Sequence, residues 1–284
     1  MTSVFELINT RSSVRAYSPE PIPAAALEEL LAFMQGIKKG PFGSALRFEF
    51  LDESAADTAE HKKLGTYGMI TGDRYYIAGA VQKGPMAELD YGYCIERIIL
   101  KATELGLGTC WLGGTLNRSS FTSRINLAAD EITPAVSPVG VPAELKRLKI
   151  ILVQKLIQAR KRKDFASLFF NGDASRPLAK DLAGRWATVL EAVQSGPSAS
   201  NKQPWRIIRM STHFHVCLDY DPLYNKAFSE FAIQKLDIGI ALCHFEAAAR
   251  ELQLPGSWEQ LDPAPDCGKF QYQLSWRYDQ AAAK

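Results

Sequence analysis

Two long segments of the sequence repeat one another, and this repeat limits the folds open to the chain. An Asp-x-Gly triplet begins the first segment at Asp90 and the second at Asp237, which lies 147 residues later. Each segment ends in Glu-Leu-x-Leu shortly before a tryptophan, and Trp258 also lies 147 residues after Trp111. Chance similarity between two buried helices is the alternative interpretation. The shared start, end and spacing favour an internal duplication.

The segments around the two long helices predict a similar order of elements in both halves. In the first half we expect helices from 23 and at 86–107, with strands at 47–52, 75–81 and 136–142. In the second half we expect helices at 183–194 and 235–252, with strands at 205–210, 213–220 and 269–278. Gly40-Pro41 and Gly196-Pro197 mark corresponding loops. The strand at 75–81 is apolar throughout, which predicts a central position in its sheet.

The composition argues against several classes of protein. The 284 residues carry a net charge of +2, so no strong field points to nucleic acid or a membrane as the partner. The N-terminus lacks a signal-peptide pattern and the longest apolar stretches are too short to span a bilayer, so we expect a cytoplasmic protein. The five cysteines are odd in number and form no Cys-x-x-Cys pair. This argues against a disulfide framework and against a zinc ribbon.

Two short motifs suit a ligand with a phosphate and a flat ring. Residues 11–15 (RSSVR) place two guanidinium groups around two hydroxyls, and both kinds of group bind phosphate. Residues 197–205 (PSASNKQPW) combine small side chains, which let a flat ligand approach the backbone, with two amide side chains that can donate and accept along a heterocycle. Taken alone, the first motif also fits a solvated loop and the second a polar Ω-loop.

Three further features have simpler interpretations. His213 and His215 point to one face of a predicted strand, but no third metal ligand is evident, so an exposed strand face is favoured over a metal site. The basic stretch 146–163 is interleaved with apolar residues, which indicates a strand leading to a basic motif rather than a nucleic-acid surface. Three tryptophans are expected to anchor the core: Trp111, Trp205 and Trp258.

Together the motifs resemble those of the FMN-dependent nitroreductase family. The segment RSSVRAYSPEPIP resembles the opening of such flavoproteins, and PSASNKQPW resembles their second FMN motif. Residues 105–114 (LGLGTCWLGG) resemble the helix–loop segment near the isoalloxazine ring, and residues 160–165 (RKRKDF) resemble the basic motif that holds the phosphate. The resemblance implies an α+β, nitroreductase-like fold with two pseudo-symmetric halves, each a mainly antiparallel sheet flanked by helices, and FMN at their interface.

The sequence departs from the family pattern in how the motifs are distributed. Ordinary members carry all of them in one shorter chain, and a homodimer builds two FMN sites. Here the first half, residues 1–172, has only GPFGSALRF where PSxxNxQPW should follow. The second half, residues 173–284, has PSASNKQPW but a poor arginine–serine motif. This partition resembles a fused, dimer-mimicking subgroup in which one complete site remains and the other is dead.

The resemblance implies a role for each matching residue, and it requires no catalytic side chain and no metal. The phosphate and ribityl contacts are expected from Arg11, Ser12, Ser13, Arg15, Arg160 and Arg162. The second-half contacts to the ring and ribityl chain are expected from Pro197, Ser198, Ala199, Asn201 and Gln203. The helix–loop segment contributes Leu112, Gly113 and Gly114, with the two glycine amides facing the flavin N5/O4 edge, and Tyr67 is expected near the ring.

The implied activity is an NAD(P)H oxidoreductase that reduces small electron-poor acceptors, of the nitroaromatic or quinone type, by ping-pong hydride transfer. A flavin-binding or storage protein without reductase turnover is the first alternative, and a flavin-free interaction protein on a degenerate scaffold is the second. The fusion removes the need for a dimer, so a monomeric pseudo-dimer is expected.

Overall fold

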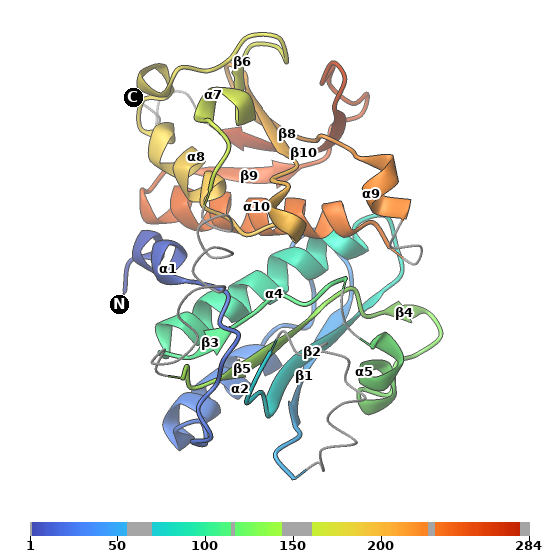
Figure 1. The fold of residues 1–284 in the computed structure, drawn as a ribbon. Coiled ribbons are helices and arrows are strands. Elements are labelled where there is room, and N and C mark those ends of the chain that lie inside the picture. The colour runs from blue at the N-terminus through green and yellow to red at the C-terminus, as the bar shows by residue number, and fades with distance from the viewer. Residues whose placement is uncertain (1, 56–69, 115–116, 144–160, 227–230, 279–284) are drawn as a thin grey trace. The chain divides into compact units, whose positions relative to one another are not determined.

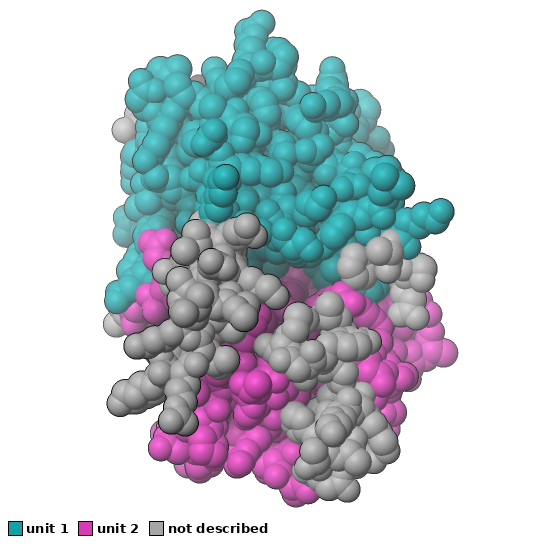
Figure 2. All heavy atoms as spheres, viewed as in Figure 1, with its two compact units in different colours: residues 1, 3–8, 154–284 teal, residues 2, 9–153 magenta. Residues whose placement is uncertain are grey.

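The computed structural model describes residues 2–55, 70–114, 117–143, 161–226 and 231–278. The chain divides into two compact units, coloured separately in Figure 2. One, here the N-terminal unit, comprises residues 9–153 together with Thr2. The other, the C-terminal unit, comprises residues 3–8 and 154–284 together with Met1. The sequence predicts that the two duplicated halves meet at 172/173. The compact units do not test where the duplicated halves meet, so this boundary stays a prediction.

The N-terminal unit is built on one antiparallel sheet with helices packed against it (Figure 1). Its strands, in the order in which they lie, are β1 (Leu46–Asp52), β2 (Tyr75–Gln82), β5 (Val136–Gly140) and β3 (Gly108–Thr109). The short strand β4 (Glu131–Ile132) pairs with the end of β2. The helices are α2 (Ala24–Gln35), α4 (Ala87–Glu104) and α5 (Arg118–Arg124). Helix α2 contacts β1, and α4 contacts β2.

The central position of β2 confirms the prediction from its apolar sequence. Residues 76–81 of this strand are all buried. Gly79 lies opposite Phe48 of β1, and a Cβ atom at position 79 would come within 2.5 Å of the Phe48 ring. The Phe48 ring in turn packs on Tyr91 of α4, with ring centroids 5.4 Å apart. Glycine at position 79 therefore leaves room for an aromatic contact that joins sheet and helix.

The C-terminal unit has a sheet of five strands, antiparallel except for one parallel pair. In the order in which they lie, the strands are β6 (Phe169–Asn171), β7 (Trp205–Arg209), β8 (His213–Leu218), β10 (Gln271–Tyr278) and β9 (Gly256–Glu259). Strands β6 and β7 form the parallel pair. The helices are α1 (Val4–Thr10, of which residues 4–8 belong to this unit), α7 (Phe165–Leu168), α8 (Trp186–Gln194), α9 (Pro222–Lys226) and α10 (Ile233–Glu251), with 3₁₀ turns η1 (Lys180–Ala183) and η2 (Ala199–Asn201).

The two sheets share one strand order once β6 is set aside. The order β1-β2-β5-β3 in the N-terminal unit corresponds to β7-β8-β10-β9 in the C-terminal unit. In each unit a helix precedes the first of these strands (α2 and α8), and a long helix (α4 and α10) lies in sequence between the second strand and the strands that complete the sheet. Each unit is thus an α+β layer arrangement with the same connectivity, as the repeat in the sequence predicts.

A buried aspartate near the start of each long helix holds the Gly-Pro loop of its own unit. Asp90 accepts hydrogen bonds from the backbone amides of Phe42, at 2.7 Å, and Ser44, at 2.8 Å. Asp237 accepts one from the amide of Ala199, at 2.9 Å. These are the two aspartates of the repeated Asp-x-Gly triplets, so the repeated aspartate has the same structural role in both units.

The structure corrects the expectation drawn from the cysteines. Cys217 of β8 and Cys267, which precedes β10, are joined by a disulfide across 50 residues of sequence. The two strands are neighbours, and Tyr272 lies opposite Cys217 in the sheet. Neither the count nor the spacing of cysteines carries this information, because sheet register brings the two residues together. The other three, Cys94, Cys110 and Cys243, are buried thiols.

Two further expectations need adjustment. The histidines of β8 share a face, as predicted, with ring centroids 5.8 Å apart, but that face is not exposed. His215 is buried and bonds to Ser275 of the neighbouring β10, and burial lowers the pKa of its imidazole. Helix α8 begins at Trp186 rather than at 183. Gly184, at φ +59°, separates it from the 3₁₀ turn η1 before it.

Aromatic packing around Trp186 fills the core of the C-terminal unit. The Trp186 ring is fully buried and lies 4.8 Å from Phe214, 5.8 Å from Phe245 and 5.0 Å from Tyr278, measured between ring centroids. These partners come from β8, α10 and β10, so one side chain of α8 joins the helix layer to the sheet.

We therefore expect Trp186→Ala to lower the free energy of unfolding by about 3–5 kcal/mol, because it leaves a cavity that three aromatic rings cannot fill. Leu182→Ala, at a side chain that is 64% exposed in the turn before α8, should change it by less than about 0.5 kcal/mol. Urea unfolding followed by circular dichroism measures both. Equal losses in the two variants would contradict the assignment of Trp186 to the core.

Candidate functional site

The loop 197–203, which leads from α8 to β7, adopts a backbone that most residues avoid. Ser200, Asn201 and Gln203 have φ values of 49°, 53° and 46°, in the left-handed region that favours glycine. Asparagine tolerates this region, whereas serine and glutamine are strained there. Three such residues within four positions persist only if the surroundings hold them, and strain of this kind is concentrated at functional sites.

The segment 161–163 holds the loop through its amide side chains. The Gln203 side chain accepts from the backbone amide of Lys163, at 2.9 Å, and donates to the Lys161 carbonyl, at 3.3 Å. Asn201 also donates to the Lys161 carbonyl, at 2.8 Å. Arg162 donates to the Asn201 side chain, at 3.4 Å, and to the Ser195 carbonyl, at 2.9 Å. The structure therefore brings the basic segment and the PSASNKQPW motif together.

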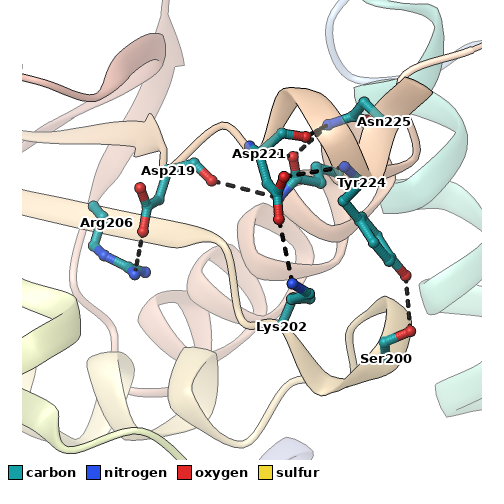
Figure 3. A network of polar contacts seen from close by, with 8 residues as sticks. Ser200, Lys202, Arg206, Asp219, Asp221, Tyr224 and Asn225 are labelled. Atoms are coloured by element: carbon teal, nitrogen blue, oxygen red, sulfur yellow. Dashed lines mark hydrogen bonds and ion pairs between the residues drawn. The ribbon is translucent and has the colours of Figure 1, made fainter. Parts of the chain in front are cut away.

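A second set of contacts reaches the loop from the chain after β8 (Figure 3). The Ser200 hydroxyl and the Tyr224 hydroxyl are 2.9 Å apart. Lys202 pairs with Asp221 at 3.2 Å, and Asp221 also accepts the backbone amide of Tyr224, at 3.0 Å. Arg206, at the start of β7, pairs with Asp219 at 2.6 Å. Tyr224, Asp219 and Asp221 lie outside every motif in the sequence, so nothing in the sequence marked them as neighbours of the loop.

The charges in this part of the C-terminal unit are mutually dependent. Burial lowers the pKa of the Arg206 guanidinium, and the Asp219 carboxylate offsets part of this effect. Lys163 has a lowered pKa because it is partly desolvated and because Arg206 and Lys202 repel its positive charge. Three cations thus share two carboxylate partners next to the loop.

In the N-terminal unit, the motif 11–15 runs beside β3. The backbone amide of Val14 donates to the Thr109 carbonyl at 2.8 Å, and Ser13 forms a bridge with Thr109. Gly108 permits this approach, since a Cβ atom there would lie 2.7 Å from the Val14 side chain. Burial raises the pKa of the Cys110 thiol, while the charges of Arg15 and Arg11 oppose that rise. Both arginines therefore act on the start of the segment 110–114.

The segment 110–114 is fixed from both sides. Leu112 exchanges two backbone hydrogen bonds of 2.9 Å with Val136. The Gly113 carbonyl accepts from Arg118 at 2.6 Å, and the Trp111 indole donates to Glu96 of α4 at 2.8 Å. Within the described part of the chain, the backbone amides of Gly113 and Gly114 donate to no protein acceptor. Among the described residues, neither amide is thus engaged by the protein.

Arg11 provides the test of whether a phosphate-bearing group fits. Its Nε atom is buried and has no hydrogen-bond partner among the described residues. A buried donor on a cation without a partner is costly, and a ligand oxygen would remove that cost. With two serines beside it in sequence and Arg15 nearby, this arrangement suits an anionic oxygen such as that of a phosphate.

The predicted site residues thus fall into two groups, one in each unit. The first comprises Arg11, Ser12, Ser13, Arg15, Leu112, Gly113 and Gly114. The second comprises Arg162, Pro197, Ser198, Ala199, Asn201 and Gln203. Tyr67 and Arg160 lie outside the described residues. Of the tryptophans expected in the core, Trp205 is fully buried, whereas Trp111 and Trp258 are partly exposed and donate to Glu96 and Glu246.

Comparison with known proteins identifies the family. A sequence profile described as "Putative TM nitroreductase" matches residues 3–249. The chain belongs to this nitroreductase family. A crystal structure of a "putative nitroreductase" from Thermotoga maritima MSB8 aligns with 98% of this chain and 94% of its own, at a TM-score of 0.59 and 19% sequence identity. The nitroreductase-like α+β fold predicted from the motifs is thereby confirmed.

Two further relatives carry functional names. A Cr(VI) reductase from Pseudomonas sp. strain G-1 is 22% identical over 169 residues, which is 51% of this chain and 69% of the relative. A nitroreductase with bound FMN from Bacteroides fragilis NCTC 9343 is 20% identical and covers 53% of this chain and 94% of its own, at a TM-score of 0.41.

The described residues contain neither a candidate metal-binding group nor a candidate membrane-spanning helix. No group of three or more His, Cys, Asp or Glu side chains in the described ranges could hold a metal ion. No helix in those ranges has the length and apolarity needed to cross a membrane.

In this nitroreductase-family chain the Gln203 side chain accepts one hydrogen bond through its oxygen and donates others through its nitrogen, and substitutions can test both roles. Gln203→Ala should lower the free energy of unfolding by about 1–3 kcal/mol, because it leaves the Lys163 amide and the Lys161 carbonyl without this partner. Gln203→Glu should be at least as destabilising, because a carboxylate oxygen would replace the donor that faces the Lys161 carbonyl and the Asn201 oxygen.

Urea unfolding and amide exchange of the peptide 161–165 measure these effects. Gln35→Ala, at the exposed end of α2, is the matched control and should change stability by less than about 0.5 kcal/mol. A stable Gln203→Glu variant would show that the glutamine does not act as a donor here.

Proposed function

We propose that this protein is an FMN-dependent oxidoreductase that takes hydride from NAD(P)H and passes it to small, flat, electron-poor acceptors. The observation that carries the proposal is the buried Arg11 Nε atom, which has no partner among the residues that the structure describes, in a segment that contains two serines and a second arginine. The amides of Gly113 and Gly114, which donate to no acceptor among the described residues, and the strained loop 197–203 support it. The FMN-bound Bacteroides relative supports the choice of flavin.

Both groups of residues are proposed to contribute to FMN binding. Arg11, Ser12, Ser13 and Arg15 would hold the phosphate, joined by Arg160 and Arg162. Backbone amides at Gly113 and Gly114 would donate to the ring edge where negative charge develops, next to Leu112. Pro197, Ser198, Ala199, Asn201, Gln203 and Tyr67 complete the proposed set. Since Gln203 is engaged by the segment 161–163, we assign it to positioning of the loop.

An internal duplication explains why the motifs are divided. The matching strand orders and the two aspartates that hold Gly-Pro loops support it. We propose halves of residues 1–172 and 173–284, of which only the second kept the PSASNKQPW loop. A single chain would then serve as the working unit, without a second copy, and we propose that it works in the cytoplasm.

The chemistry of the reaction belongs to the cofactor. When bound, FMN supplies a two-electron carrier that a nicotinamide can reduce and an acceptor can oxidise in turn. The residues of this chain bind and orient the phosphate, donate backbone hydrogen bonds at Gly113 and Gly114, and fix the loop 197–203. A nitroaromatic or quinone is the proposed acceptor class. The Pseudomonas relative named Cr(VI) reductase adds chromate to the acceptors worth testing.

The purified protein is expected to be yellow and to lose its flavin absorbance when NADH or NADPH is added without oxygen. Re-oxidation by a panel of nitroaromatics, quinones and chromate should restore the absorbance. A yellow protein that neither nicotinamide bleaches would indicate flavin binding without reductase turnover. A colourless protein that also ignores added FMN would refute the proposal.

Arg11→Ala is expected to raise the Kd for FMN by about 10- to 150-fold, the equivalent of one lost charge-assisted hydrogen bond of about 1.5–3 kcal/mol. The Kd for riboflavin, which has no phosphate, should change little. Arg277→Ala, at an exposed arginine of β10, serves as control and should leave both constants unchanged. Fluorescence titration measures all of them. An equal loss of FMN and riboflavin affinity would argue against a phosphate contact at Arg11.

A further inference from the structure

Asp237 has an unusual environment for a carboxyl group. Its side chain is 3% exposed, one oxygen accepts the Ala199 amide at 2.9 Å, and the other, Oδ2, is buried without a partner among the described residues. The contact fixes the residue directly before the left-handed pair Ser200 and Asn201. A carboxyl group deep in the C-terminal unit therefore anchors a strained segment of backbone.

Asp90 occupies the corresponding position in the N-terminal unit and is a carboxylate with hydrogen-bond donors at both oxygens. Each of its oxygens accepts a backbone amide, from Phe42 and from Ser44. The Ser44 side chain and the positive charge of Lys39 also favour its charged form, although burial raises the pKa of the group. Asp237 has one amide in place of these four favourable contacts.

The difference decides the protonation state. An unpaired buried charge costs more than an unpaired buried hydroxyl, so Asp237 is better accommodated as the neutral acid. Burial raises its pKa to about 8, and the Ala199 amide offsets only part of that rise. Tyr224 of α9, whose pKa the Asp237 charge helps to raise, is an ionisable neighbour and brings no positive charge.

We propose that Asp237 is a positioning residue that anchors the loop 197–203 in its neutral form, so that its ionisation loosens the loop and weakens flavin binding. The binding part of this inference rests on the proposed function. In the neutral form the carbonyl oxygen still accepts the Ala199 amide. Ionisation places an uncompensated charge at Oδ2, and the loop must open to let water reach it.

The sign of the stability effect follows from the same shift. The folded chain keeps a proton that the unfolded chain releases at the ordinary pKa of an aspartate, near 4. Stability is therefore lost as the pH rises from about 4 to about 8 and is level above that. Asp237→Asn cannot ionise and keeps the carbonyl acceptor, so it should lack this slope.

The experiment measures the FMN Kd of the full chain between pH 7 and pH 9 in the wild type, Asp237→Asn and Asp181→Asn, a control at an exposed aspartate. If only the neutral form holds the loop, the wild-type Kd rises by about tenfold over this range, the change in its protonated fraction for a pKa near 8. Asp237→Asn should be flat, and Asp181→Asn should follow the wild type. Because flavin's own titration is common to all three proteins, the slopes and not the absolute affinities are compared.

A second measurement needs no flavin. In the unliganded protein, amide exchange of the peptide 196–205, corrected for the intrinsic pH dependence, should accelerate between pH 7 and pH 9 in the wild type and not in Asp237→Asn. If no protein binds FMN while exchange behaves as expected, the proposed function fails and the positioning role of Asp237 stands. An Asp237→Asn variant that keeps the wild-type slope in both measurements overturns the inference.

Discussion

Each unit depends on a carboxyl group that is removed from water and bonded to the backbone of a loop. Asp90 and Asp237 stand near the starts of their long helices, and each fixes the Gly-Pro loop that precedes the first main strand of its sheet. Without that anchor, the loop amides would be buried without acceptors and the strand after them would lose its fixed start. Each loop is thereby held at the entrance to its sheet, before β1 in one unit and before β7 in the other.

Much of the fold could be predicted from the sequence because its signals are local. The apolar run at 75–81, the long segment from 86 and the alternation before 278 identify elements that the structure contains, with bounds that differ by a few residues. Contacts between distant residues could not be predicted. The Cys217–Cys267 disulfide and the buried face of His215 depend on which strands are neighbours, and no spacing in the sequence encodes that.

In the candidate site too, local motifs could be predicted from the sequence, whereas contacts between distant residues could not. Residue types indicated the ligand chemistry of the motifs 11–15 and 197–205, because guanidinium, hydroxyl and amide groups have few uses in such a pattern. The residues that support the loop, such as Tyr224 and Asp221, escaped notice because a tyrosine or aspartate after a strand is ordinary. The roles of Gln203 and Asn201 also became visible only with their partners: their amides hold the segment 161–163 in place.

The first helix makes the C-terminal unit discontinuous in sequence. Residues 3–8 belong to the C-terminal unit, where Glu251 at the end of α10 accepts the Ser3 hydroxyl and the Val4 amide. The polypeptide thus enters the C-terminal unit, leaves to build the N-terminal unit, and returns. A cut at 153/154 would separate α10 from α1, so no single continuous stretch of the chain encodes the C-terminal unit. A fragment that begins after residue 153 would lack the Ser3 and Val4 donors of Glu251 and would need an added segment in place of α1.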